Sequence, residues 1–407
     1  MHYLCYLVSF LLLAVNAEAF DAEQLKEWKE KDPEFVIRLE EHVKKWPTNE
    51  AGQASGVTGF SCSNGVSATV PTNVHSVRPG DIKVVAAFGD SITAGNGAGA
   101  TNVLEMLLQY RGMTFAIGGD DDLEHRVTIP NILRKFNPNV FGQSHGIGDA
   151  TEWPVAYLNT AEPGMRSDDL VNQAHEMIAK MREHPDNIDM VNDWKLITIF
   201  IGGNDMCRYC HDSKDEQPEV FISNIIAAIQ VLQENIPRLI VNVMSVLHVE
   251  LVRQIDADNF LCIELHKKEC VCVDDPTFTV QEMSQIETAF TMLEQQLMMN
   301  GTFDTSDDFT LVVQPLISNT TVLPRLPDGS IDLSYFTPDC FHFSAKLHSV
   351  IARGLWNNML QPVGSKQNDF GFGSQNASLS CPDPACPFIR TTKNSANCAP
   401  YLTPAAG

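Results

Sequence analysis

The chain has 407 residues, of which 28 are lysine or arginine and 51 are aspartate or glutamate, so its formal net charge is -23 at pH 7. A protein this acidic is not attracted to nucleic acid or to an anionic membrane surface, and no run of basic residues offsets the charge. Any lipid surface that it meets is expected to be neutral or zwitterionic.

An apolar run at the N-terminus predicts a secretory signal peptide over residues 1–19. Residues 6–15 are mostly apolar, and residues 17–19 have the small-x-small pattern of a cleavage site. A retained signal anchor is the alternative, although the run is too short to span a membrane comfortably. No later segment approaches a transmembrane length, and the last residues lack the hydrophobic tail of a lipid anchor. We therefore expect a secreted protein without a transmembrane anchor.

Residues 20–80 form an N-terminal segment ahead of the main fold. Residues 20–50 are rich in glutamate and lysine with apolar residues at helical intervals, which predicts one or two short amphipathic helices. Residues 51–80 are rich in glycine, serine, threonine and asparagine, which is typical of a loop. The segment is either a pro-segment or a brace packed on the core, and both interpretations stay open.

From residue 81 onward, apolar runs typical of buried strands are separated by helical stretches. The expected strands cover residues 82–88, 196–201, 239–246 and 309–313, and the expected helices cover residues 168–181, 220–236, 281–299 and 344–360. Strands this apolar, with crossovers this long, indicate parallel neighbours buried on both faces. We expect a three-layer α/β sandwich with a mostly parallel sheet over residues 81–362, followed by a cysteine-bearing extension over residues 363–407.

The first expected strand leads into Ser91. Residues 84–88 are apolar, Gly89 permits a sharp turn, and a helix can begin at Ser91. The hydroxyl then lies at a helix N-terminus, where free N–H groups favour developing negative charge, as acyl transfer requires. On the alternative interpretation, Asp90 or Ser91 only caps the helix.

Further motifs are expected near the carboxyl ends of the strands, where open parallel sheets bind ligands. Gly164 lies in a loop before a predicted helix, Asn204 follows the second expected strand, and Asp339 and His342 follow the fourth after a long loop. Each has a structural alternative. Gly164 and Asn204 are ordinary turn residues, and Asp339 to His342 can simply begin the helix that follows, in which case His348 is an equally good imidazole.

Together these side chains have the chemistry of a serine esterase. A serine hydroxyl becomes a nucleophile when an imidazole takes its proton, and a carboxylate holds that imidazole in the required tautomer. Asp339 and His342 are three positions apart, so one helical turn would place them on the same side. The Ser91 N–H, the Gly164 N–H and the Asn204 side-chain amide can form an oxyanion hole.

The order of these motifs resembles the GDSL, or SGNH, hydrolase family, and the flanking sequence is similar to the animal phospholipase B type of lipase. The resemblance covers roughly residues 30–400. It is carried by residues 88–99, 110–112, 117–120, 130–134, 136–138, 158–164, 201–205 and 387–395. Ile92 stands where the family name has leucine, which is a volume-conserving change.

This resemblance implies a flavodoxin-like sheet and esterase chemistry with neither a metal nor a cofactor. It also implies Ser91 as nucleophile, His342 as base and Asp339 as the residue that orients it, with Ser91, Gly164 and Asn204 at the oxyanion. The membrane-associated members have tandem repeats and an anchor, whereas we expect one unit and no anchor here. Their localisation therefore does not carry over.

Eleven cysteines are present; Cys5 lies in the expected signal peptide, and the other ten can pair in an oxidising compartment. The ten are Cys62, Cys207, Cys210, Cys262, Cys270, Cys272, Cys340, Cys381, Cys386 and Cys398. Cys207, Cys210 and His211 match the pattern of covalent haem attachment and resemble half of a zinc site or a redox pair. Structural disulfides are favoured, because Cys270 and Cys272 have the wrong spacing for a second zinc knuckle. Connectivity stays open, with a Cys270–Cys272 bridge least expected.

We therefore predict a secreted serine esterase that cleaves acyl esters of phospholipids and lysophospholipids through an acyl-enzyme. Two alternatives stay open: an esterase of acetylated carbohydrates or other small esters on the same fold, and a secreted lipid-binding protein without catalysis. Asn300, Asn319 and Asn376 begin glycosylation patterns and are candidate acceptors.

Overall fold

A computed structural model describes residues 22–47, 56–212, 214, 217–256, 259–369, 371–372 and 378–406. The predicted signal peptide and Asn376 lie outside the described residues. Within them, no helix combines the length and the apolar character needed to cross a membrane.

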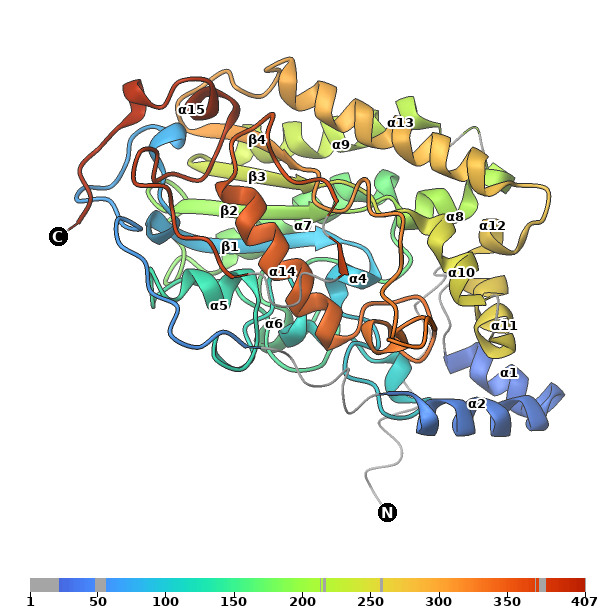
Figure 1. The fold of residues 1–407 in the computed structure, drawn as a ribbon. Coiled ribbons are helices and arrows are strands. Elements are labelled where there is room, and N and C mark those ends of the chain that lie inside the picture. The colour runs from blue at the N-terminus through green and yellow to red at the C-terminus, as the bar shows by residue number, and fades with distance from the viewer. Residues whose placement is uncertain are drawn as a thin grey trace.

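A parallel sheet forms the centre of the fold (Figure 1). Its four strands lie side by side in chain order as β1 (Ile82–Gly89), β2 (Trp194–Phe200), β3 (Leu239–Met244) and β4 (Phe309–Gln314). Gly89, Phe200, Met244 and Gln314 are opposite one another in register, so all four carboxyl ends reach the same edge. The predicted α/β class with a parallel sheet is confirmed, and this edge is where its ligands are expected.

The outer edge of β1 is covered by two short segments. Phe141 and Asn159 make isolated parallel bridges with Val84 and Ala87, respectively. The Ala87 N–H donates to the Leu158 carbonyl at 3.0 Å. A flavodoxin-like sheet carries its second strand at this position. The arrangement is therefore flavodoxin-like, with an irregular edge in place of a complete strand.

Helices cover both faces of the sheet, which makes the three layers. On one face lie α7 (Leu170–Glu183), α9 (Pro218–Asn235) and α13 (Val280–Met299), and on the other lie α5 (Ile129–Leu133) and α14 (Ala345–Leu360). β1 serves both layers, because Ala86 and Phe88 pack in the first core and Val85 and Ala87 in the second. Successive side chains of each strand point to opposite faces of the sheet. Both faces are covered by helices, so both sets of side chains are apolar.

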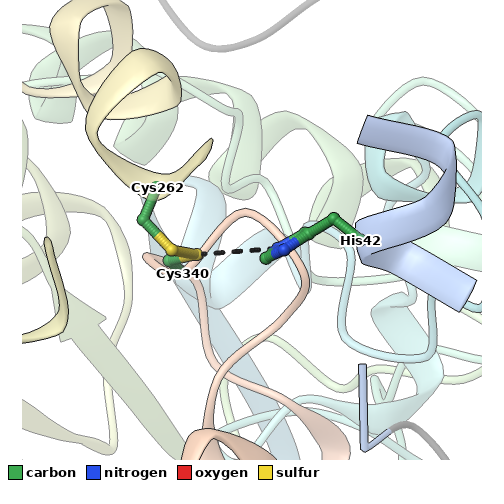
Figure 2. A group of neighbouring side chains, drawn as sticks. All are labelled: His42, Cys262 and Cys340. Atoms are coloured by element: carbon green, nitrogen blue, oxygen red, sulfur yellow. Dashed lines mark hydrogen bonds between the residues drawn. A yellow bond between two sulfur atoms is a disulfide. The ribbon is translucent and has the colours of Figure 1, made fainter. Parts of the chain in front are cut away.

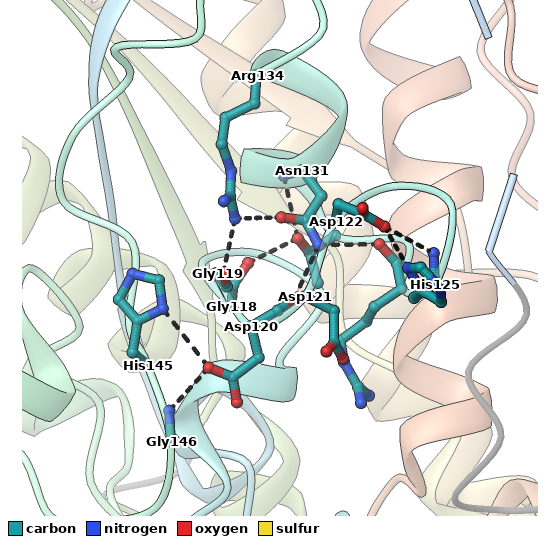
Figure 3. Close-up of polar contacts among 12 residues, drawn as sticks. Gly118, Gly119, Asp120, Asp121, Asp122, His125, Asn131, Arg134, His145 and Gly146 are labelled. Atoms are coloured by element: carbon teal, nitrogen blue, oxygen red, sulfur yellow. Dashed lines mark hydrogen bonds and ion pairs between the residues drawn. The ribbon is translucent and has the colours of Figure 1, made fainter. Parts of the chain in front are cut away.

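The connection from α4 (Ser91–Ala94) to α7 includes the short helices α5 and α6 (Trp153–Ala156) but otherwise has little regular structure, and polar side chains hold it (Figure 3). The Asn131 side-chain amide donates to the Asp120 carbonyl at 3.1 Å, and the Arg134 guanidinium donates to the Gly119 carbonyl at 2.7 Å. The Asp120 carboxylate accepts the Gly146 N–H at 2.9 Å. These side chains therefore fix the conformation of the loop by binding its backbone groups. Several of them lie in the motifs that carry the resemblance.

The two amphipathic helices expected near the N-terminus are α1 (Ala22–Lys31) and α2 (Pro33–Lys45). Their apolar faces form a small separate core with the loop around Met106 and with Leu265. Two side chains reach further: the Trp46 indole donates to the Phe336 carbonyl at 3.0 Å, and His42 Nε2 lies 3.0 Å from the Pro338 carbonyl oxygen. This segment therefore packs directly against the loop that carries Asp339.

Beyond the carboxyl ends of the strands lie α8 (Gly203–Asp212), α10 (Val252–Asp256), α11 (Phe260–Glu269) and α12 (Val271–Asp274).

Five disulfides join all ten cysteines: Cys62–Cys381, Cys207–Cys270, Cys210–Cys272, Cys262–Cys340 and Cys386–Cys398. Cys207 and Cys210 are both bonded, so their sulfur atoms are not available for haem attachment or as zinc-binding thiolates.

Residues 378–406, which include α15 (Thr392–Ala396), lie across the loop that precedes β1. The Ile389 N–H donates to the Val77 carbonyl at 2.9 Å, and the Ala406 N–H donates to the Val66 carbonyl at 3.0 Å. With the Cys62–Cys381 disulfide, these bonds attach the C-terminal extension to the N-terminal loop.

Candidate active site

Ser91 lies at the carboxyl end of β1, on the single helical turn α4. Gly89 has a φ of +147°, and a Cβ there would lie 2.0 Å from the Phe200 carbonyl oxygen, so only glycine fits this turn. The Asp90 side chain caps α4 by accepting the Ile92 N–H at 3.0 Å. Asp90 therefore caps the helix, as one interpretation of this motif predicted, and Ser91 is the first helical residue.

Ser91, His342 and Asp339 lie in hydrogen-bonding series although Ser91 and His342 are 251 positions apart. Ser91 Oγ is 2.8 Å from His342 Nε2, and His342 Nδ1 is 2.8 Å from Asp339 Oδ2. An ionised carboxylate only accepts, so Nδ1 carries the proton and the Nε2 lone pair faces the serine hydroxyl. All three side chains are buried, which strengthens each of these interactions.

Asp339 and His342 lie on an irregular turn, so the predicted helical turn is wrong. α14 begins only at Ala345, and Cys340 has a φ of +67°, which a right-handed helix does not allow. Asp339 Oδ1 accepts the N–H groups of Phe341 and His342 at 2.9 Å each. The carboxylate thus shapes the turn that presents the imidazole, as aspartate does in other local turns.

The charge state of Asp339 follows from its surroundings. Burial raises its pKa, but the neighbouring His342 and the hydrogen bonds to the carboxylate lower it further, so the pKa is well below the usual aspartate value. Oxygen atoms of Glu269 and Asp339 and a ring nitrogen of His342 lie within 4.8 Å of one another. Burial, and then the charge of Asp339, raise the pKa of Glu269 well above the usual range. This buried cluster therefore holds one ionised and one neutral carboxyl group.

Of the other predicted oxyanion residues, Gly164 lies on a loop and Asn204 lies in the first turn of α8, which packs against that loop. The Asn204 side-chain amide donates to the Met165 carbonyl at 2.9 Å, next to Gly164, which has a φ of +78°. One residue on, the Asp205 carboxylate accepts the Ser167 N–H at 3.1 Å. These bonds fasten the start of α8 to the Gly164 loop. They explain why an aspartate follows Asn204.

Two supporting residues were not predicted. The Gln173 side chain donates to the Gly89 carbonyl at 2.8 Å and accepts the Gly89 N–H at 2.9 Å, so α7 fixes the turn before Ser91. The buried Arg111 guanidinium donates to the Asn159 and Ala161 carbonyls at 3.0 and 2.8 Å, on the segment that leads to Gly164. Arg111 lies in residues 110–112, one of the motifs that carry the family resemblance, so the sequence could have indicated it. Nothing in the helical pattern distinguishes Gln173 from its neighbours.

His348, the alternative imidazole, is a core residue on α14. Its Nδ1 accepts the Phe115 N–H at 3.3 Å, and its ring stacks on the Phe115 ring. Burial lowers the pKa of His348 to about 3, so the ring stays neutral. With Nδ1 committed to the backbone, His348 is held as a packed side chain.

Among the described residues, His248, Glu250 and Glu287 form the other buried group with metal-binding side chains and no cysteine. His248 Nδ1 lies 2.8 Å from Glu250 and 3.3 Å from Glu287, and Nε2 lies 2.8 Å from the Ser318 carbonyl oxygen. Burial lowers the pKa of His248, but the two carboxyl groups raise it more, to about 10. An imidazolium paired with these carboxyl groups accounts for the cluster.

A family model of GDSL-like lipases and acylhydrolases matches residues 85–355, which include Ser91 and His342. The chain belongs to the GDSL-like lipase/acylhydrolase family. The family is one of lipases and acylhydrolases, which are carboxylic ester hydrolases. The motif order described from the sequence thus identified the family correctly.

Three proteins named "Phospholipase B1, membrane-associated" are similar to this GDSL-like hydrolase. The identity is 43% over 334 residues for the Homo sapiens protein, 41% over 344 for that of Mus musculus and 40% over 346 for that of Rattus norvegicus. The matches cover 80%, 83% and 83% of this chain but 23%, 23% and 24% of the relatives. The chain therefore spans about a quarter of the length of these relatives.

Proposed function

We propose that this GDSL-like hydrolase is a secreted serine esterase that hydrolyses acyl esters of phospholipids and lysophospholipids. In this proposal Ser91 is the nucleophile, His342 is the general base and Asp339 orients the imidazole. The observation that carries it is the hydrogen-bonded series from Ser91 Oγ through His342 to Asp339, with each step 2.8 Å long.

The reaction follows from the direction of these bonds. His342 Nε2 takes the hydroxyl proton as Ser91 attacks the ester carbonyl, and the Asp339 carboxylate stabilises the resulting imidazolium. The oxyanion is met by the N–H groups of Ser91 and Gly164 and by the Asn204 amide. His342 then protonates the departing alcohol, which leaves an acyl-enzyme. Water activated by the same imidazole hydrolyses it, and no cofactor takes part.

Two observations support a lipid as substrate. The relatives are named phospholipases. In addition, Phe341 and Phe343, on either side of His342, line an apolar cavity of about 60 Å³ together with Leu251, Ile317 and Leu347. Ser91 and His342 do not line this cavity, so it supports an apolar substrate only through the two phenylalanines next to the base in the chain.

Five disulfides support secretion, because disulfides persist in oxidising compartments. Asn300 and Asn319 are exposed, as glycosylation requires, and we propose both as acceptors. We further propose residues 81–362 as the catalytic domain and residues 363–407 as its attached extension.

Labelling and product analysis on the full chain test the proposal. A fluorophosphonate should add one phosphonyl group to Ser91, and Ser91→Ala should lose both labelling and hydrolysis while melting at an unchanged temperature. Ser223→Ala, at an exposed position on α9, is the matched control and should behave as the parent. A phospholipid with two different acyl chains, assayed beside a short acetyl ester, identifies the substrate class. Faster turnover of the acetyl ester would favour a small-ester esterase, and an unlabelled Ser91 would favour a binding protein.

A further inference from the structure

One face of α11 lies against the turn that carries Asp339 and His342. Cys262, His266 and Glu269 are spaced i, i+4 and i+7 along this helix, so they project on the same side. Cys262 is bonded to Cys340. All three side chains are buried, whereas Lys267 and Lys268 on the same helix are exposed.

The turn at Cys340 needs outside support. Its φ of +67° is unfavourable for a residue with a Cβ, and such residues persist where their surroundings fix them. Figure 2 shows Cys340 between α11, which supplies Cys262, and α2, which supplies His42. His42 Nε2 also lies 3.0 Å from the Pro338 carbonyl oxygen. The turn is therefore held by a disulfide to α11 on one side and by a contact from α2 on the other.

His266 binds the Asp339 carbonyl of this turn. Its Nε2 lies 3.1 Å from the Asp339 carbonyl oxygen, and its Nδ1 lies 2.6 Å from the Asp256 carboxylate on α10. A carbonyl and a carboxylate both only accept, so both ring nitrogens carry protons: Nε2 donates to the Asp339 carbonyl and Nδ1 donates to Asp256. Asp256 orients the ring of His266 in the way that Asp339 orients that of His342. A second aspartate–histidine pair thus lies behind the first, joined to it through the backbone of Asp339.

We infer that His266, oriented by Asp256, is a positioning residue for the proposed catalytic pair Asp339–His342. The inference rests on the proposed function. Without the bond to its carbonyl, the Asp339 peptide can rotate toward a less strained backbone, and this moves the imidazole relative to Ser91. A misplacement of about 1 Å lowers turnover by about 100-fold, although substrate contacts are unchanged.

Steady-state kinetics on three variants test this inference. His266→Leu removes the donor, whereas His266→Gln keeps an amide N–H at a position that can reach the Asp339 carbonyl. We expect kcat of the leucine variant to fall about 10- to 100-fold with KM changed less than about threefold, and the glutamine variant to recover most of the loss. The rate of fluorophosphonate labelling at Ser91 should fall in parallel. His175→Leu, at an exposed position on α7, is the control and should retain the parental kcat.

Every result of these experiments either supports or overturns the inference. A folded leucine variant with kcat within twofold of the parent, or a glutamine variant as slow as the leucine variant, overturns the inference. If the leucine variant does not fold, Asp256→Asn leaves the imidazole in place but weakens its orientation; a reduced kcat with unchanged KM supports the inference, and an unchanged kcat overturns it. An unmodified protein that neither reacts at Ser91 nor hydrolyses esters overturns the proposed function itself, and the inference with it.

Discussion

Replacing Asp339 by asparagine changes one atom of the proposed triad and reverses a hydrogen bond. Oδ1 of Asp339 accepts the N–H groups of Phe341 and His342, and an amide oxygen can keep both bonds. The amide nitrogen must then replace Oδ2, which accepts His342 Nδ1–H at 2.8 Å. Two N–H groups cannot face each other, so the imidazole moves its proton to Nε2. In that tautomer it cannot take the proton of Ser91.

The expected loss is large and specific. In Ser-His-Asp hydrolases the wrong tautomer lowers turnover by about 10⁴-fold, which is about 5.5 kcal/mol of activation free energy. We expect Asp339→Asn to lower kcat by this order with little change in KM, and to slow fluorophosphonate labelling of Ser91 equally. Asp186→Asn, at an exposed position after α7, is the control. An Asp339→Asn enzyme that retains a tenth of the parental kcat would refute the reasoning.

The same substitution has a signature in stability. The pKa of Asp339 is lowered in the folded protein, so its ionised form stabilises the fold above the unfolded-state pKa of about 3.9 and this contribution disappears as the pH falls further. The melting temperature of Asp339→Asn should therefore lie below that of the parent at pH 7 and approach it toward pH 3. A gap that stays constant over this range would contradict the assignment.

Three further changes probe other parts of the molecule. Asn204→Ala should lower kcat by about 10²- to 10³-fold with KM nearly unchanged, because it removes one oxyanion donor; equal losses in both parameters would contradict that role. Burial raises the pKa of Glu294 to about 8 in the folded protein, whereas the unfolded chain has the ordinary glutamate pKa. The unfolded chain therefore loses this proton first as the pH rises, and the folded state loses stability. Glu294→Gln should raise the free energy of unfolding in urea by about 3 kcal/mol at pH 7 and leave it unchanged at pH 4. Trp46→Phe leaves the Phe336 carbonyl unpaired, so it should lower the free energy of unfolding by about 1–3 kcal/mol and also lower kcat. An unchanged kcat would favour the pro-segment interpretation of residues 20–80 over the brace.

The strands and the position of Ser91 could be predicted because their information is local. The expected strand over residues 309–313 is observed as Phe309–Gln314, and Gly89 forms the turn that its sequence position indicates. A buried parallel strand requires a short apolar run, and a sharp turn between strand and helix requires glycine, wherever the rest of the chain lies. A parallel sheet then brings the loops after its strands to one edge.

The turn at Asp339 could not be predicted in the same way. Asp339 and His342 have helical spacing and stand next to a true helix, so local pattern favours a helical turn. The left-handed Cys340 between them depends on a disulfide to Cys262 and on contacts from α2, which lies about 300 residues earlier in the chain. Tertiary contacts here override local preference, and the pairing of cysteines cannot be read from their spacing.

The residues that support the site are hidden from pattern analysis for a related reason. Gln173 and His266 lie on the buried faces of their helices, and hydrophobic periodicity indicates at most that such a position faces inward. Their importance comes from polar atoms directed at single backbone groups: Gln173 at both groups of Gly89, and His266 at the carbonyl of Asp339. A buried polar side chain without a partner is costly, so most such residues on an inward face have a specific target. Finding that target requires knowing which loop packs against the helix, and here the loops are those that carry Ser91 and His342.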